Sequence, residues 1–161
     1  MLTFAAIIFT FALLTLLGYA FHAMFHKPWS GQFFKAHMNH HLKQYPPTDF
    51  YSDTYRYAGK DNTVVLFGLV FSPLVVTMIV LTATGAVSLF LGLSVLAEMG
   101  IIGWLNNSLH DSFHLRNTFW ERFAFFERLK KLHFQHHVNM QSNYGIFSFV
   151  WDKIFRTYND Y

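Results

Sequence analysis

Long apolar stretches alternate with polar segments along this chain. Residues 3–21 are mostly apolar and approach the ~20 residues that cross a bilayer as a helix. A second apolar block covers residues 62–110, has Glu98 as its one charged residue, and is long enough for two helices. Because Gly85 tolerates a tight reversal, we predict a hinge at residues 82–86.

This pattern predicts three membrane-spanning helices, near residues 3–21, 64–82 and 86–105. Pro73 falls inside the second span, where it kinks a helix rather than ending it. The first run has no basic residues before it and no small-residue cleavage site after it, which favours a membrane anchor over a cleaved signal peptide. We therefore predict an all-α, multi-pass helical bundle embedded in the membrane.

The basic residues indicate how the bundle is oriented. With three spans, the polar segments at residues 22–63 and 106–161 lie on the same side of the membrane. By the positive-inside rule both face the cytoplasm and Met1 lies outside. Acidic residues are interleaved with the basic ones, which argues against a nucleic-acid partner. The two segments contain every Lys and Arg of the chain: Lys27, Lys35, Lys43, Arg56, Lys60, Arg116, Arg122, Arg128, Lys130, Lys131, Lys153 and Arg156.

Composition agrees with a membrane protein. The chain has 161 residues, of which 53% are hydrophobic and 13% charged, and its mean hydropathy is +0.24. Soluble domains are about a quarter charged, so this chain has too little polar surface to cover itself in water. The length allows one domain over residues 1–161. Cysteine is absent, which excludes disulfides, iron–sulfur clusters, thiolate zinc sites and cysteine nucleophiles.

Three further features carry structural signals. Pro46 and Pro47 predict the end of the helix that precedes them. Residues 118–121 fit a capping box that opens a helix toward Lys131, and aromatic residues around this helix place it at the membrane interface or packed on both sides. Glu98 is costly within a span, so we expect a hydrogen bond between helices or an oligomer contact there, with a role near the substrate as the alternative.

All ten histidines fall into four clusters, in the order pair, triple, pair, triple. Helix positions i, i+3 and i+4 project from one face, so each cluster is expected to present its imidazoles in one direction. The predicted topology gathers all four clusters on the cytoplasmic side. The clusters are His22 and His26; His37, His40 and His41; His110 and His114; and His133, His136 and His137.

Such a concentration of imidazole points to metal. Neutral imidazole is a strong ligand for iron, zinc, copper and nickel, and one metal rarely takes more than three or four protein ligands. Ten histidines are therefore enough for two metals, with some left to support the ligands. Scattered surface histidines would not share a helical phase four times, so we predict a histidine-built metal centre.

Two motifs follow the clusters: Asn143-Tyr144-Gly145, then Trp151-Asp152-Lys153-Ile154-Phe155-Arg156-Thr157-Tyr158. With the clusters, they resemble the fatty acid hydroxylase/sterol desaturase superfamily of integral-membrane, histidine-rich di-iron oxygenases. The resemblance covers residues 22–158, and the last cluster with its continuation is the most specific part. Beta-carotene hydroxylases, alkane hydroxylases and alkylglycerol-type oxygenases are similar in plan.

The resemblance implies oxygen-dependent hydroxylation or desaturation of an unactivated C–H bond in a lipid. It also implies that the ten histidines are ligands of two iron ions, with zinc as a substitute, or their immediate neighbours. Relatives are commonly longer and commonly have four spans. We therefore expect that the substrate tunnel is completed either by a partner protomer in an oligomer or by the interfacial helix. The alternative is a minimal member of the family with a small or unusual substrate. Arg156 stands where the family often has glycine.

Four other residues are candidates for supporting the ligands: Asp152, Asn143, Asp111 and Asn107. Asp152 is expected either to orient a ligand imidazole or to pair with Arg156 one turn later. The two candidates beside His110 either support ligands or cap a helix.

Electrons must come from a separate ferredoxin, cytochrome or reductase, because the chain has no flavin or NAD fingerprint, no haem domain and no cysteine. The basic cytoplasmic face is suited to an acidic donor. Some of the twenty phenylalanines are expected to line a dry path for the lipid, while most contact the bilayer.

Three alternatives remain at this stage. His110 and His114 have the spacing of a zinc-peptidase helix, with Asp111 in place of the general-base Glu, but a three-ligand site leaves seven histidines unexplained. Bis-histidine haem binding fits poorly, since the clusters lie at or beyond the ends of the spans. The third alternative is an inactive, metal-binding subunit of a larger membrane complex. The sequence does not choose among fatty acyl, sterol, carotenoid and alkane substrates.

Overall fold

A computed structural model describes residues 2–52 and 62–160 of the chain. Every regular element in this described part is helical, in agreement with the predicted all-α class. Arg56 and Lys60, two of the basic residues used above to predict the orientation, lie outside the described residues.

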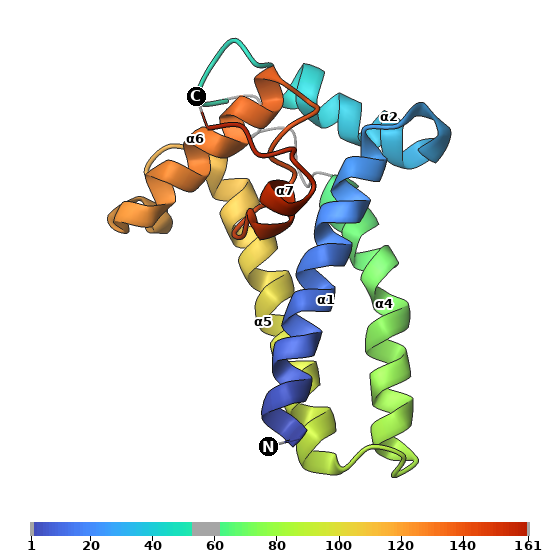
Figure 1. Cartoon of the computed structure of the whole chain (residues 1–161). Coiled ribbons are helices and arrows are strands. Elements are labelled where there is room, and N and C mark those ends of the chain that lie inside the picture. Colours follow the sequence, from blue (N-terminus) through green and yellow to red (C-terminus); the bar gives the residue numbers. More distant parts are fainter. Residues whose placement is uncertain (1, 53–61, 161) are drawn as a thin grey trace.

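Three long helices form the body of the molecule: α1 (Leu2–Phe25), α4 (Asn62–Ala83) and α5 (Leu89–Phe113). Both α1 and α4 pack against α5 (Figure 1). By length and apolar composition α1 and α5 are candidate membrane spans, whereas the apolar stretch recognised in α4, residues 68–83, is shorter. Most side chains of the two candidate spans are not buried inside the protein, which indicates a membrane protein.

The turn between α4 and α5 lies close to the predicted hinge. Gly85 has a φ of +76°, a conformation that favours glycine. The hydroxyl of Ser88 accepts a hydrogen bond from the Leu91 N–H and caps the start of α5. A Cβ atom at Gly92 would collide with the Thr82 side chain, so glycine permits the two helices to approach closely there.

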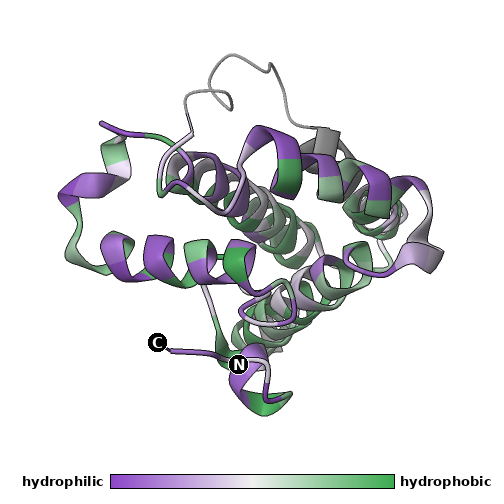
Figure 2. Ribbon diagram, turned by 90° about the horizontal axis from the view of Figure 1, so that it is seen from above, coloured by the Kyte–Doolittle hydropathy of each residue, from purple (hydrophilic) through white to green (hydrophobic). Residues whose placement is uncertain are grey.

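The other elements form a polar cap at the end of the bundle opposite the N-terminus (Figures 1 and 2). One half of the cap follows α1 and stops before Pro46, as predicted; the other follows α5. In chain order the elements are the 3-10 turn η1 (Pro28–Ser30), α2 (Gln32–Asn39), the π-helical turn η2 (His40–Gln44), the 3-10 turn η3 (Phe119–Arg122), α6 (Ala124–Val138) and α7 (Val150–Ile154).

An apolar cluster joins the end of α5 to the cap. It consists of Leu109, Phe113, Trp120 and Phe126, which are almost fully buried. The Trp120 indole N–H also donates to the Ser108 hydroxyl at 2.8 Å, so its polar atom is satisfied. This cluster fixes α6 across the end of α5.

Two local expectations differ from the structure. The capping box at residues 118–121 does not form: Thr118 makes no side-chain cap, and Glu121 instead accepts from the Asn117 N–H at 3.1 Å. The helix consequently begins later, at Ala124.

Within the described residues, one carboxylate oxygen of Glu98 is buried without a hydrogen-bond partner, so this oxygen makes no bond between helices. The other expectations for Glu98, an oligomer contact or a role near the substrate, stay predictions.

Candidate metal centre

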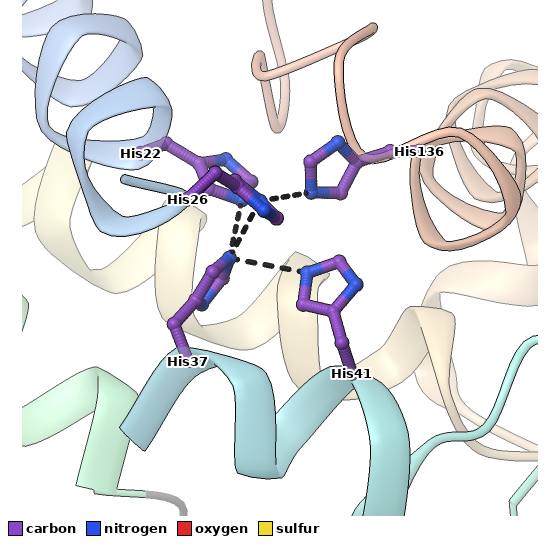
Figure 3. Close-up of side chains that lie close together, drawn as sticks. All are labelled: His22, His26, His37, His41 and His136. Atoms are coloured by element: carbon purple, nitrogen blue, oxygen red, sulfur yellow. Dashed lines mark hydrogen bonds between the residues drawn. The ribbon is translucent and has the colours of Figure 1, made fainter. Parts of the chain in front are cut away.

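The histidine clusters converge where the bundle meets the cap. Nine of the ten histidines form two groups, and within each group the candidate ligand atoms all lie within 4.8 Å of one another. The first group is drawn in Figure 3 and takes its members from α1, the turn directly after it, α2, η2 and α6. It consists of His22, His26, His37, His41 and His136, and the second of His40, His114, His133 and His137.

Each histidine triple divides between the two groups. His37 and His41 belong to the first group while His40 belongs to the second; His133 and His137 belong to the second while His136 belongs to the first. Successive helical positions are ~100° apart, so i and i+4 stay together while the residue between them in sequence turns to the other side. Neighbouring histidines therefore connect the two groups.

In the first group the Nε2 atoms crowd around one point. The Nε2 atom of His37 lies 3.1 Å from that of His22, 2.9 Å from that of His26 and 3.1 Å from that of His41. The Nε2 atoms of His26 and His136 are 3.0 Å apart.

Hydrogen bonding does not account for this packing. A nitrogen of neutral imidazole is either one donor or one acceptor, so the His37 Nε2 atom can satisfy only one of its three neighbours. Nitrogen ligands ~2.0–2.1 Å from a shared ion lie ~3.0 Å apart at right angles and ~3.4 Å apart in a tetrahedron. The observed separations match this range, so the donor set fits a metal ion.

The second group has the same character. The Nε2 atom of His133 lies 3.3 Å from that of His114 and 3.2 Å from that of His137. The ring of His40 is 4.7 Å from that of His114, centroid to centroid. His110 lies outside both groups, but its ring centroid is 4.9 Å from that of His40, so it borders the second group.

Burial keeps these imidazoles in the form that binds metal. Desolvation holds the pKa of His37, His41 and His133 well below the ordinary value, and neighbouring histidines add to the effect. The pKa of His26 is lowered to about 3 by burial and by the positive charge of Lys27. Neutral imidazole has a lone pair to donate, so the sites are ready for metal near neutral pH.

Backbone carbonyls orient three of the rings through Nδ1. The Nδ1 atom of His22 lies 2.6 Å from the Tyr144 carbonyl oxygen, that of His136 lies 2.6 Å from the Ser142 oxygen, and that of His137 lies 3.2 Å from the Tyr45 oxygen. A proton on Nδ1 leaves the Nε2 lone pair free to bind metal. Sequence reasoning did not identify these carbonyls, because a backbone acceptor has no signature in residue identity.

Asp152 holds the loop that supplies one of these carbonyls. Its fully buried carboxylate accepts from the Tyr144 N–H at 2.7 Å, the Gly145 N–H at 2.8 Å and the Thr157 hydroxyl at 2.8 Å. Burial raises the pKa of Asp152, and these hydrogen bonds oppose that shift. Asp152 therefore binds the backbone of the loop that contacts His22 and does not contact an imidazole itself. The expected ion pair between Asp152 and Arg156 does not form either; the carboxylate binds Tyr144, Gly145 and Thr157 instead.

Asn143 joins the same loop to the C-terminal segment. Its side-chain amide donates to the carbonyl oxygens of Leu132 and Asn159 and accepts from the Asn159 N–H. Both Asn143 and Arg156 have positive φ angles, of 55° and 61°. The positive φ of Arg156 is a backbone conformation that favours glycine. This agrees with the expectation that glycine is common at this position.

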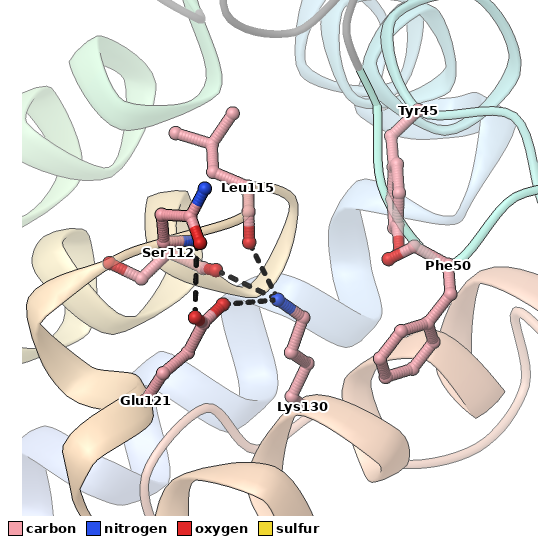
Figure 4. A network of polar contacts seen from close by, with 7 residues as sticks. Tyr45, Phe50, Ser112, Leu115, Glu121 and Lys130 are labelled. Carbon is pink, nitrogen blue, oxygen red and sulfur yellow. Dashed lines mark hydrogen bonds and ion pairs between the residues drawn. The ribbon is translucent and has the colours of Figure 1, made fainter.

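Lys130 of α6 reaches the C-terminal end of α5, where it contacts Ser112, Leu115 and Glu121 (Figure 4). Its buried ammonium donates to the Leu115 carbonyl oxygen at 2.6 Å, pairs with Glu121 at 3.5 Å and lies 4.1 Å from the centre of the Tyr51 ring. The positive charge sits at the C-terminal end of α5, where the helix dipole favours cations. This contact holds α6 against the segment that carries His114.

A cavity of about 260 Å³ opens beside the histidines, between α1, α4, α5 and residues 144–148. His22, His37 and His110 are among the residues that line it. Asn107 also lines the cavity, whereas Asp111 follows His110 at the end of α5, where its carbonyl oxygen accepts from the His114 N–H. A three-ligand zinc-peptidase site explains neither of the two histidine groups.

The comparisons with known proteins identify the family. The fatty acid hydroxylase family model matches residues 7–157, which is most of the chain. No match was found among curated proteins or among solved structures. Because the family match spans both histidine groups and the loop that supports them, the chain belongs to the fatty acid hydroxylase family.

Proposed function

We propose that this chain is a membrane-embedded di-iron oxygenase that hydroxylates or desaturates an unactivated C–H bond of a lipid. The observation that carries the proposal is the convergence of the His37 Nε2 atom on three other imidazole nitrogens, an arrangement that a shared metal satisfies and hydrogen bonds do not. Membership of the family supports the lipid substrate and the oxidative chemistry.

The histidine groups would each hold one ion, with the ten histidines as ligands or their neighbours and His110 bordering the second group. When bound, a pair of irons supplies electrons for O–O cleavage and the oxidising power to attack an aliphatic C–H bond. The chain's own part is to fix the imidazoles through carbonyl contacts at Nδ1 and to keep them neutral by burial.

The reaction needs two electrons and two protons from outside. In hydroxylation one oxygen atom of O₂ enters the C–H bond and the other leaves as water; in desaturation two hydrogens leave adjacent carbons and both oxygens leave as water. A separate ferredoxin, cytochrome or reductase would donate the electrons, since the chain has no cysteine to hold an iron–sulfur cluster.

The apolar cavity beside His22 and His37 would bring the lipid to the metals and exclude water. We further propose that α4 joins α1 and α5 as a third span. The N-terminus then lies outside and both histidine groups lie on the cytoplasmic side, with the basic polar segments.

Oxygen incorporation tests this function. The purified, iron-loaded protein in lipid nanodiscs is supplied with native lipid extract, NADPH, ferredoxin and its reductase under ¹⁸O₂. We expect a lipid product that carries one ¹⁸O atom, or one that has lost two hydrogens, and that forms only with reductant. The His37→Ala variant is the matched inactive control. An iron-loaded protein that consumes no oxygen with any lipid would instead be a non-catalytic subunit.

A further inference from the structure

The cavity beside the metal centre is lined both by histidines and by apolar residues that lie further along the helices. The histidines in the lining are His22, His37 and His110. Leu14, Val75 and Met99 line the cavity further along α1, α4 and α5. Leu14 precedes His22 by eight residues and Met99 precedes His110 by eleven, which at 1.5 Å per helical residue gives a length of ~12–16 Å. The space is therefore elongated and runs from the histidines toward the middle of α1 and α5.

Two asparagines line this cavity next to the histidines. Asn106 and Asn107 precede His110 by four and three residues on α5, within about one helical turn of it. The side-chain oxygen of Asn107 is buried and has no hydrogen-bond partner among the described residues. An unsatisfied buried acceptor is destabilising, so its presence at a cavity wall needs a reason.

Two other polar side chains at the wall are already paired within the protein. The Thr15 hydroxyl donates to the Phe11 carbonyl oxygen and accepts from the Trp151 indole N–H. The Tyr19 hydroxyl lies 3.2 Å from that of Thr157. The Asn107 oxygen thus differs from these two hydroxyls, because it has hydrogen-bonding capacity left for a ligand.

Glycine leaves room opposite the asparagines. A Cβ atom at Gly18 of α1 would lie 3.9 Å from the Asn106 amide nitrogen, so the α1 backbone faces this amide across a narrow gap. Gly18 also lines the cavity. A side chain larger than that of glycine at this position would therefore extend toward the Asn106 amide.

We propose that Asn107, with Asn106, binds a hydrogen-bond donor of the substrate, such as a hydroxyl or an amide N–H, while the apolar chain extends toward Leu14 and Met99. This rests on the proposed function, and it makes the substrate an amphiphile oxidised within a few carbons of its polar group. A plain alkane would leave the Asn107 oxygen unpaired and would bind more weakly.

The test compares two ligands of equal chain length, 1-dodecanol and dodecane. Radiolabelled ligand is bound to the as-purified protein in nanodiscs, without reductant or oxygen, and counts on empty nanodiscs are subtracted. We expect about tenfold tighter binding of dodecanol, because one hydrogen bond to an otherwise unpaired acceptor has roughly this effect. Asn107→Leu should remove the preference by weakening dodecanol binding alone, and Asn106→Leu should reduce it.

Ser94→Ala is the matched control, since Ser94 lies on the same helix, bonds to the Phe90 carbonyl oxygen and does not line the cavity. Metal content reports whether each variant keeps its fold. Equal binding of the two ligands by the wild-type protein would overturn the inference, as would an intact Asn107→Leu protein that keeps the preference. Because the assay involves no turnover, its failure is distinct from failure of the ¹⁸O experiment.

Discussion

The Nδ1 atom of His22 lies 2.6 Å from the carbonyl oxygen of Tyr144, although 122 positions separate the two residues in sequence. The carbonyl is held in place because Asp152 binds the N–H groups of Tyr144 and Gly145. Through this contact the C-terminal motif orients a ring of the first histidine group.

Asp152→Asn should loosen that orientation. The amide of asparagine can accept from one of the two N–H groups but not from both, so the Tyr144 carbonyl loses part of its support. We expect metal affinity at the first group to fall about 10-fold to 100-fold, the range typical when a residue behind a ligand is changed. Metal titration of the purified variant measures this.

Asp160→Asn is the control for the Asp152 variant. Asp160 pairs with Arg128 at 3.3 Å, and both side chains are largely exposed. Its loss should leave metal affinity unchanged. Equal metal affinities for the Asp152 variant and the wild type would mean that the loop does not orient His22.

The helices were predictable from the apolar pattern, but one end was not. The third predicted span stops at residue 105, where the polar pair Asn106 and Asn107 begins, whereas α5 continues to Phe113. A polar pair within an apolar run resembles a helix end. In the structure the pair instead faces a cavity, which only the arrangement of α1, α4 and α5 creates.

The histidines were recognisable as a set, but their grouping was not. Sequence spacing gave each triple one common direction, whereas His40 and His41 separate into different groups. Part of this follows from helical geometry, since adjacent residues point ~100° apart. The remainder depends on the π-helical turn at His40–Gln44 and on partners such as His136, which come from distant parts of the chain.

Adjacent histidines should therefore affect different metals. His136→Ala should remove the ion of the first group, and His137→Ala that of the second, so each variant retains about one ion of two. The double variant should retain none. Metal quantification of the three proteins, each checked for helicity by circular dichroism, gives the answer; complete loss from either single variant would show that the two sites are not separable.

Gly145 is predicted to tolerate no larger residue. A Cβ atom there would collide with the Ser148 carbonyl oxygen and lie 2.9 Å from the Asp152 carboxylate. Gly145→Ala should destabilise the protein by ~1–3 kcal/mol, as overpacking does, and weaken metal binding at His22. Gly100→Ala is the control, because a Cβ atom at Gly100 meets nothing within 4 Å. Thermal melting in detergent compares them; similar melting temperatures would count against a tightly packed loop.

Acid should destabilise the metal-free protein. Because burial and Lys27 lower the pKa of His26 to about 3, the unfolded chain takes up a proton near its ordinary pKa of ~6.5 while the folded chain does not. The contribution of His26 to the free energy of unfolding is then fully present above about pH 6.5 and is lost as the pH decreases toward 3. Acid also weakens metal binding, because protons compete with the metal for the imidazole nitrogens.

Melting temperatures of the chelator-treated protein at several pH values test the sign of this dependence. They should fall with pH below about 6.5, and His26→Ala should make the fall less steep. A melting temperature that stays constant or rises on acidification would contradict the buried neutral state of these imidazoles.

Metal content of the wild-type protein tests the central claim most directly. Two separate histidine groups predict about two ions per chain, with histidine nitrogens as the protein ligands, in protein purified from iron-supplied cells. Inductively coupled plasma mass spectrometry with protein quantification gives the ratio, and X-ray absorption gives the ligand atoms. A ratio near two with nitrogen ligands supports the account, whereas a ratio near zero or one would contradict a two-metal oxygenase.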